Sequence, residues 1–221
     1  MERYRFSKGW KNNCSKELIE MRAFLWCNGE LPSQEIIDNL GEISPLFGVD
    51  GGGNKANSLG FEVKEILGDL DSIDNNDSQT KRTLLENQNF SDLTKTINEL
   101  VKRGFSEFEI LGVDGGDTGH MLGVWGSLAE LPDDLVIRLY HQNSTTHRIT
   151  SKLGSFEFEM GKDKVFSVFA LSKCQNLYIK GAEWEIFNEE LDLSTKGLHN
   201  KGLGDPITIS GDGILALIIE N

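Results

Sequence analysis

The sequence has few residues of the kinds that build disulfide frameworks or sulfur- and imidazole-based metal sites. Its three cysteines (Cys14, Cys27 and Cys174) lie far apart in no metal-ligand spacing, and its four histidines form no HExxH-like cluster. An odd number of scattered cysteines is typical of ordinary thiols in a reducing compartment. We therefore expect neither disulfides nor a metal site built on cysteine or histidine.

Positive charge is also scarce. The chain has 22 Lys and Arg residues against 35 Asp and Glu residues, a net charge of -13, which argues against a nucleic-acid partner or an anionic membrane. No apolar run approaches the length of a membrane span, and residues 1–16 lack the apolar core of a secretory signal. We therefore expect a cytoplasmic protein. Any binding of phosphate groups needs metal cations or a local cluster of its few basic residues, which favours a metal-dependent site.

The first part of the chain alternates between strand-like and helix-like segments. Apolar runs that end in Gly/Asp turns predict strands at 22–27, 46–49, 63–67, 108–113 and 135–140. Helical spacing predicts helices at 34–40, 92–103 and 118–131, a further one from about 78 to 88, and a short one at 16–21. This alternation predicts an α/β fold, in which helices flank a mostly parallel sheet.

After His141 the pattern changes to short alternating runs separated by glycines. They predict strands at 156–159, 165–170, 177–179, 184–187, 207–209 and 214–219. We expect a small all-β sandwich. The predicted domains are residues 1–143, with 1–21 as an extension, and residues 144–221, joined by a linker at 142–146.

The chain is organised around the segment Gly68–Ile73 (GDLDSI), which follows an apolar strand. Ligands of open α/β sheets gather beyond the carboxyl ends of the strands, so this turn lies where a site is expected. The carboxylates of Asp69 and Asp71 and the hydroxyl of Ser72 are hard oxygen ligands that suit Mg²⁺ and bound phosphates. The alternative is a polar turn whose aspartates only bond backbone amides.

Two other Gly/Asp turns end strands on the same predicted edge. They begin at Asp50 (DGGGNK) and at Asp114 (DGGD), and Asp92 opens a helix nearby. Glycines in such turns leave amide groups free for phosphate oxygens, and aspartates supply Mg²⁺ ligands for phosphoryl transfer. Taken alone, Asp92 also fits a simple helix-start acid that favours the macrodipole.

The ordered set of motifs resembles the thiamine pyrophosphokinase family over nearly the whole chain from Arg22. Asp50–Lys55 is similar to the family's DGGANR, and Gly68–Ile73 to its GD(L/F)DSI. Ser91–Lys95 (SDLTK) is similar to its TDxxK, and Gly181–Ile186 (GAEWEI) to its GLKWxL. The resemblance implies transfer of pyrophosphate from ATP to the hydroxyl of thiamine or a related heteroaromatic alcohol, with Mg²⁺, in a homodimer.

The resemblance also implies roles for individual residues. It makes Asp69, Asp71 and Asp92 the metal ligands and assigns the reaction centre to Asp71 and Asp92. The residues that it implies for ATP binding are Asp50, Gly51, Gly52, Asn54, Lys55, Ser72, Lys95, Gly115, Gly116 and His120. It places Trp184 and Asn200 against the acceptor.

The chain departs from the family pattern at one phosphate-facing turn. Where the family has GGRxD(H/Q), this chain has Asp117 in place of the arginine and Gly119 in place of the aspartate. Near the C-terminus His199-Asn200 replaces a Ser-Asn pair. Losing a cation that stabilises a phosphoryl transition state can cost several kcal/mol. A binding protein for a nucleotide or thiamine-like ligand therefore stays open as an alternative to the pyrophosphokinase. A second alternative, based on the Asp-x-Asp turn, is a phosphatase with Asp69 as nucleophile and Asp71 as acid.

Overall fold

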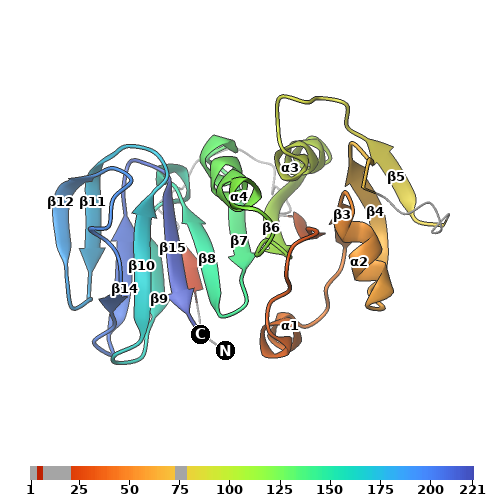
Figure 1. The fold of residues 1–221 in the computed structure, drawn as a ribbon. Helices are drawn as coiled ribbons and strands as arrows, with labels where there is room; N and C mark the ends of the chain where they lie inside the picture. Colours follow the sequence, from red (N-terminus) through yellow and green to blue (C-terminus); the bar gives the residue numbers. More distant parts are fainter. Residues whose placement is uncertain (1–3, 7–20, 73–78) are drawn as a thin grey trace, which may run out of the picture. The chain divides into compact units, whose positions relative to one another are not determined.

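The computed structural model describes residues 4–6, 21–72 and 79–221, which form two compact units (Figure 1). One unit contains residues 21–72, 79–131 and 137–143; the other contains 4–6, 132–136 and 144–221. The short helix expected at 16–21 lies outside the described residues, apart from Met21, which begins a strand. Among the described helices, none combines the length and the apolar character that crossing a membrane requires.

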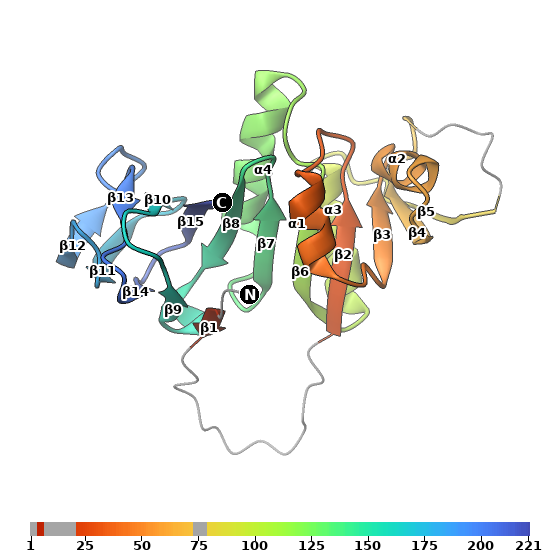
Figure 2. The same ribbon diagram turned by 90° about the horizontal axis from the view of Figure 1, so that it is seen from below.

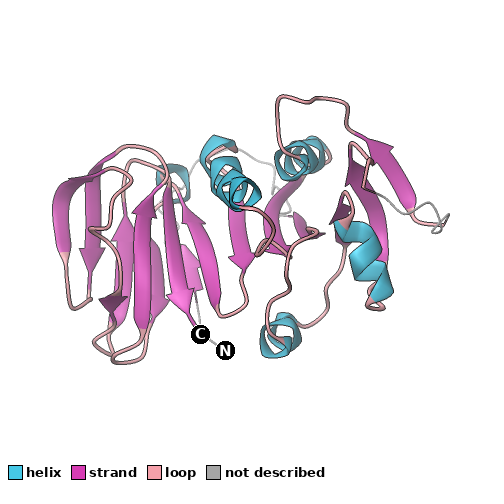
Figure 3. Ribbon diagram, in the orientation of Figure 1, coloured by secondary structure: helices cyan, strands magenta, loops and turns pink. Residues whose placement is uncertain are grey.

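The first unit is an α/β unit. Its strands are β2 (Met21–Trp26), β3 (Leu46–Val49), β4 (Val63–Gly68), β5 (Lys81–Leu84), β6 (Phe105–Leu111) and β7 (Val136–Tyr140), in the order β7-β6-β2-β3-β4-β5. From β6 to β5 every neighbouring pair is parallel. The flanking helices are α1 (Gln34–Leu40), α2 (Gly52–Ser58), α3 (Asp92–Lys102) and α4 (Thr118–Glu130) (Figure 3). The predicted parallel sheet flanked by helices is confirmed.

The core of this unit explains why the strands read as continuous apolar runs. Phe24 and Trp26 of β2 and Ile66 of β4 are fully buried, as expected for a parallel sheet covered on both faces. Helix α3 begins where its sequence predicts, because the hydroxyl of Ser91 accepts a hydrogen bond from the amide of Thr94 at 3.1 Å. Because the strands from β6 to β4 run parallel, the carboxyl ends of β3, β4 and β6 meet at the same edge of the sheet.

Two local predictions for this unit are wrong. The helix expected at about 78–88 is instead, within the described residues, strand β5 followed by a loop. Glu65 of β4 is buried and accepts hydrogen bonds from Lys81 and Thr83, which fixes this segment as an edge strand. Helix α2 was not predicted, because Gly52-Gly53 has no apolar periodicity and a low helix propensity.

The second unit is all-β, as predicted. Strands β1 (Tyr4–Phe6), β9 (Phe156–Glu159), β14 (Pro206–Ser210), β11 (Cys174–Lys180) and β12 (Ile186–Leu191) form one sheet in this order. Strands β13 (Asn200–Lys201), β10 (Val165–Ala170), β15 (Leu215–Glu220) and β8 (Ser144–Ile149) pair in the other, and a 3₁₀ turn (Ser151–Leu153) follows β8. All pairs are antiparallel, and Phe158, Phe166 and Leu217 share one core.

Two segments differ from the predicted layout. Strand β8 starts at Ser144, so most of the linker expected at 142–146 is regular structure. Strand β1 pairs with β9, with Tyr4 opposite Phe158, so part of the expected N-terminal extension is a strand of the second unit (Figure 2).

Candidate functional site

Three carboxylates from two neighbouring strand ends meet at the edge of the parallel sheet. Asp50 follows β3, and Asp69 and Asp71 follow β4; one oxygen from each lies within 4.8 Å of the others. Asp50 and Asp69 are half-buried and Asp71 is exposed. Such a set of hard oxygen ligands, open to solvent on one side, is what Mg²⁺ prefers when it also binds phosphates.

The backbone of both turns is held in uncommon conformations that direct these carboxylates toward each other. Asp50 has φ 46° and Leu70 has φ 65°, in the left-handed region that non-glycine residues seldom adopt. A Cβ on Gly68 would lie 3.0 Å from the Cβ of Asp50, so only glycine lets β4 pass this close. Such strain is often found at binding sites.

Of the three acidic residues, Asp50 has the surroundings that most clearly call for a bound cation. Its Oδ1 is buried and has no hydrogen-bond partner among the described residues. Burial is the main cause that raises the pKa of Asp50, and the charges of Asp92 and Asp69 raise it further, while hydrogen bonds from Gly51 and Ser72 lower it. A buried, unpaired carboxylate oxygen is costly, so the residues present fit a bound divalent cation.

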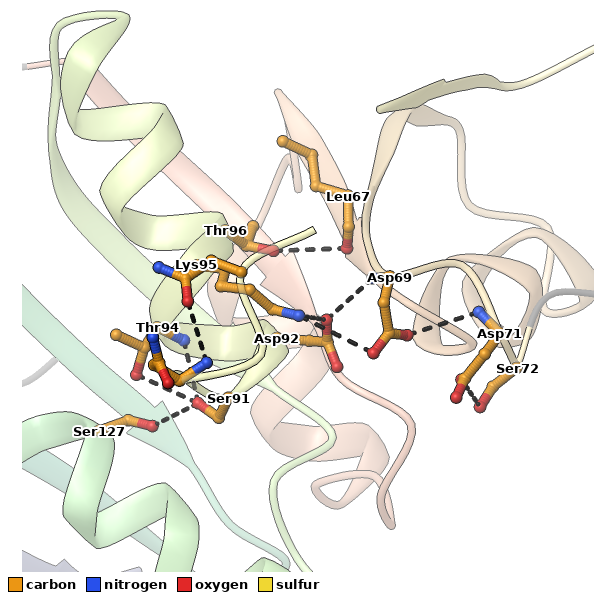
Figure 4. A network of polar contacts seen from close by, with 12 residues as sticks. Leu67, Asp69, Asp71, Ser72, Ser91, Asp92, Thr94, Lys95, Thr96 and Ser127 are labelled. Atoms are coloured by element: carbon orange, nitrogen blue, oxygen red, sulfur yellow. Dashed lines mark hydrogen bonds and ion pairs between the residues drawn. The ribbon is translucent and has the colours of Figure 1, made fainter. Parts of the chain in front are cut away.

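Asp92 belongs to a neighbouring ion-pair cluster. Its Oδ1 accepts a hydrogen bond from the amide of Asp69 at 3.0 Å and lies 2.8 Å from the Nζ of Lys95. The same ammonium is 3.8 Å from Oδ2 of Asp69 (Figure 4). The Lys95 side chain is 5% exposed, so α3 supplies a buried cation between two acidic residues. The structure therefore groups Asp50 with Asp69 and Asp71, and places Asp92 beside Lys95.

Gly51 and Gly52, which follow Asp50 and which the resemblance assigns to ATP binding, are also tightly packed against neighbouring segments. A Cβ on Gly52 would lie 2.1 Å from the carbonyl oxygen of Trp26, and one on Gly51 would lie 3.1 Å from the Asn28 amide nitrogen. These glycines let α2 sit directly against β2 and the segment that follows it. Both therefore have a packing reason in addition to any contact with ligand.

Asn54, Lys55 and Ser72 complete this side of the site. The Oδ1 of Asn54 is buried without a partner among the described residues, whereas Lys55 donates to the carbonyl of Gly29. The hydroxyl of Ser72 lies 2.9 Å from Oδ1 of Asp71 and donates to it. Ser72 thus lies beside the carboxylate of Asp71, while the ammonium of Lys55 is bound to the backbone.

A cavity of about 690 Å³ borders the cluster through Lys95. Its other walls are the loop after β5, including Leu85 and Phe90, and the α3 residues Asn98 and Lys102. This volume lies in the range of small-molecule sites. Lys95 therefore lies both at the acidic edge and in the wall of this cavity.

The third turn, after β6, has the expected glycines and an unexpected role for Asp117. Gly115 and Gly116 have φ 77° and 78°. Asp117 is the N-cap of α4: its Oδ1 accepts from the amide of His120 at 3.1 Å, and its other oxygen pairs with the His120 ring. The capping hydrogen bond is the main cause that lowers the pKa of Asp117. The residue that replaces the family's arginine thus fixes the start of a helix.

In the second unit, Asn200 holds the backbone of Trp184. Its side chain accepts from the amide of Trp184 at 3.1 Å and donates to the carbonyl of the same residue at 2.7 Å. Asn200 is buried, while Trp184 is 54% exposed. The structure thus leaves the indole open to solvent and uses Asn200 to set its backbone.

Sequence reasoning missed a polar cluster around Asp114 that involves Glu30, His141 and Gln142. These residues come from three loops that are far apart in the chain. The glycines after Asp114 marked the turn, but no short-range pattern indicates its partners.

Comparison with known proteins agrees with this geometry. Residues 41–140, which contain all three acidic turns, match the family model of the thiamin pyrophosphokinase catalytic domain. This segment is therefore similar to the catalytic domain of thiamin pyrophosphokinases. No curated protein matches the chain in a sequence search.

Solved structures of thiamin pyrophosphokinases share the fold at low identity. The Bacillus subtilis enzyme superposes with a TM-score of 0.76 at 20% identity, covering 91% of this chain and 99% of the other. The Candida albicans enzyme gives 0.70 at 14% identity, covering 92% and 90%. The yeast enzyme gives 0.70 at 13% identity, covering 91% and 86%. The likeness therefore covers both units of this divergent chain.

Proposed function

We propose that this chain is a Mg²⁺-dependent diphosphotransferase that moves the pyrophosphoryl group of ATP to the hydroxyl of thiamine or a related heteroaromatic alcohol and releases AMP. The observation that carries the proposal is the convergence of Asp50, Asp69 and Asp71 within the segment that matches the catalytic domain. In this reaction the acceptor oxygen bonds to the β-phosphorus of ATP. The bond from that phosphorus to the bridging oxygen of the α-phosphate breaks, and AMP leaves.

Asp50, Asp69 and Asp71 would hold the metal, because one oxygen of each lies within 4.8 Å of the others. In addition, Oδ1 of Asp50 is buried without a hydrogen-bond partner among the described residues. When bound, Mg²⁺ would neutralise charge on the transferred phosphates. Lys95 adds a fixed positive charge beside Asp69, in a buried position where electrostatic interactions are strong. Gly115 and Gly116 would offer their amides to the nucleotide.

The proton of the acceptor hydroxyl needs a carboxylate base. Asp92 is already neutralised by Lys95 at 2.8 Å and accepts from the amide of Asp69. Asp71 is exposed and has only the weak donor Ser72 on one oxygen among the described contacts. We therefore assign the proton to Asp71 and a supporting role to Asp92, whose pairing with Lys95 orders the turn.

The acceptor would stack on the exposed indole of Trp184, a flat apolar surface that suits an aromatic ring. Asn200 would act on the acceptor through the backbone of Trp184. We expect the active form to be a homodimer.

A second candidate function is binding of a nucleotide or thiamine-like ligand without turnover. The observation that favours it is Asp117, which caps α4 where the family pattern has an arginine. Without that cation, a phosphoryl transition state would be less stabilised.

The products of one incubation separate these functions. With ATP, Mg²⁺ and thiamine, a pyrophosphokinase yields AMP and thiamine diphosphate in equal amounts. A phosphatase releases inorganic phosphate from phosphoesters alone, and a binding protein yields none of these products. Asp71→Asn should abolish AMP formation, while Glu190→Gln, an exposed acid of the second unit, should leave it unchanged. Equal turnover in Asp71→Asn would refute the assignment of the site.

A further inference from the structure

Three loops at the carboxyl edge of the parallel sheet are joined by a closed ring of hydrogen bonds. The amide of Glu30, after β2, donates to the carbonyl of Asp114, after β6, at 2.6 Å. The amide of Gln142, after β7, donates to Oδ2 of Asp114 at 2.8 Å. The side-chain amide of Gln142 donates to the carboxylate of Glu30 and closes the ring.

His141 adds a fourth member that connects this ring to α4. Its Nδ1 lies 2.5 Å from Oδ1 of Asp114, so each oxygen of that carboxylate has a partner from the loop after β7. The imidazole also stacks on Trp125 of α4, with ring centres 6.0 Å apart and planes 17° apart. The His141 side chain is 14% exposed and that of Asp114 is 26% exposed, so the pair is largely shielded from water.

The ring fixes the position at which the glycine turn begins. Asp114 directly precedes Gly115 and Gly116, both in the left-handed region. A Cβ on Gly115 would lie 2.8 Å from Cγ of Glu30, so this side chain packs directly against the turn. The turn is therefore held through the backbone and side chain of Asp114 and through the side chain of Glu30.

The sheet does not need this ring for its own ladder. The main-chain pairing of β2 with β6 already continues past the strands, through Cys27 to Leu111 and Gly29 to Gly112, both at 2.8 Å. The side chains of Asp114, His141 and Gln142 act beyond that ladder, at the turn itself. Polar groups that fix one turn at a ligand-bearing edge are typical of support for a binding site.

We infer that the Asp114–His141 hydrogen bond positions the Gly115–Gly116 turn to bind the triphosphate of the nucleotide. This inference rests on the proposed function, and it makes Asp114 and His141 positioning residues that do not themselves touch the substrate. The turn amides can bind phosphate oxygens only if their direction is fixed in advance, which lowers the cost of binding. The sequence brings the pair together only through the fold, since 27 residues separate them.

Two substitutions at His141 separate the hydrogen bond from the ring stacking. His141→Phe keeps an aromatic ring against Trp125 and removes the donor to Asp114. His141→Asn removes the ring and keeps an amide N–H close to the position of Nδ1. If the hydrogen bond positions the turn, Phe should weaken nucleotide binding and Asn should preserve it. If only the packing against Trp125 matters, His141→Asn should weaken nucleotide binding and His141→Phe should preserve it.

The test is calorimetric titration of the full chain with Mg²⁺ and α,β-methylene-ATP, whose α–β linkage cannot be cleaved. We expect the dissociation constant to rise about tenfold in His141→Phe and in Asp114→Ala, and to stay near the wild-type value in His141→Asn. Lys173→Met, which breaks an exposed ion pair in the second unit, is the matched control. Urea unfolding of each variant confirms that it is folded.

The outcomes distinguish this inference from the proposed function. Unchanged affinity in His141→Phe and Asp114→Ala, or tight binding in Phe and weak binding in Asn, overturns the inference and leaves the proposed function standing. Wild-type binding of the analogue with the expected loss in His141→Phe, but no AMP from ATP with either thiamine or related heteroaromatic alcohols, supports the inference and overturns the proposed function. A wild-type chain that binds no nucleotide overturns both.

Discussion

The ammonium of Lys95 lies 2.8 Å from Oδ1 of Asp92, one helical turn earlier on α3, and both are held beside the acidic turn that follows β4. Lys95 is buried, so it is a permanent part of this edge and not a mobile surface cation. The pair lets the chain concentrate carboxylates at one site before any metal arrives.

We first predict that removing this ammonium destabilises the metal-free protein. Lys95→Met leaves Asp69 and Asp92 close together without a cation, and should lower the free energy of unfolding by about 2 kcal/mol. Added Mg²⁺ should stabilise this variant more than it stabilises the wild type, since the metal supplies the missing charge. Urea unfolding with and without Mg²⁺ measures both effects. Lys102 lies on the same helix and is 75% exposed, so Lys102→Met should change neither the free energy of unfolding nor its response to Mg²⁺. An equal loss of stability in Lys95→Met and Lys102→Met would contradict the prediction.

The second prediction concerns the start of α4. Asp117→Ala removes the oxygen that accepts from the amide of His120, and should lower the free energy of unfolding by about 1 kcal/mol. Asp117→Ser keeps a capping oxygen and should stay close to the wild type. If urea unfolding shows the same loss for serine as for alanine, capping does not explain why an acid is found here.

The third prediction separates Trp184 from Asn200. Trp184→Ala should hardly change stability, because the indole is 54% exposed, but it should raise the KM for the acceptor by roughly two- to tenfold. Asn200→Ala leaves the amide and carbonyl of Trp184 without their partners and should cost about 1–3 kcal/mol. Steady-state kinetics and urea unfolding of both variants test this division. A large stability loss in Trp184→Ala together with an unchanged KM would contradict it.

The fourth prediction follows from the titration of Glu65. Burial raises the pKa of Glu65, but hydrogen bonds from Thr83, Arg103 and Lys81 outweigh it, so that the pKa lies below its ordinary value of 4.5. A carboxyl group with a lowered folded-state pKa contributes stability above its unfolded pKa and loses it as the pH falls through the folded value. The wild type should therefore lose more stability on acidification than Glu65→Gln does.

Urea unfolding at about pH 6 and about pH 3.5 measures this difference. At the higher pH the wild type should be more stable than Glu65→Gln. At the lower pH the difference in free energy of unfolding between the two proteins, the gap, should narrow. A gap that stays constant or widens on acidification would show that Glu65 is not the group responsible.

Sequence patterns predicted the elements whose signals are local. Helix α3 follows from the Ser91 cap and the spacing of Leu93, Ile97 and Leu100, and the buried strands follow from their apolar runs. The prediction of a helix at strand β5 is wrong, because three of its four residues are polar and its conformation depends on pairing with β4, through the buried Glu65. Helix α2 depends on close backbone packing, which no periodicity reveals.

The candidate site shows the same division. The motifs at Asp50, Asp69 and Asp92 identified the acidic edge, because each acid ends a strand or starts a helix. Their grouping could not be predicted: which carboxylates share a cation depends on the left-handed turn at Asp50 and on where Lys95 points. The Asp114–His141 pair had no sequence signal at all, since it joins two separate loops.

The central claim is that Asp50, Asp69 and Asp71 together hold the Mg²⁺ that accompanies ATP. The most direct measurement is calorimetric titration of α,β-methylene-ATP into the wild type and Asp69→Asn, each with Mg²⁺ and with a chelator. The account predicts one site per chain in the wild type with Mg²⁺, and binding at least about tenfold weaker in the variant or with the chelator. Equal affinity in all four titrations would contradict it.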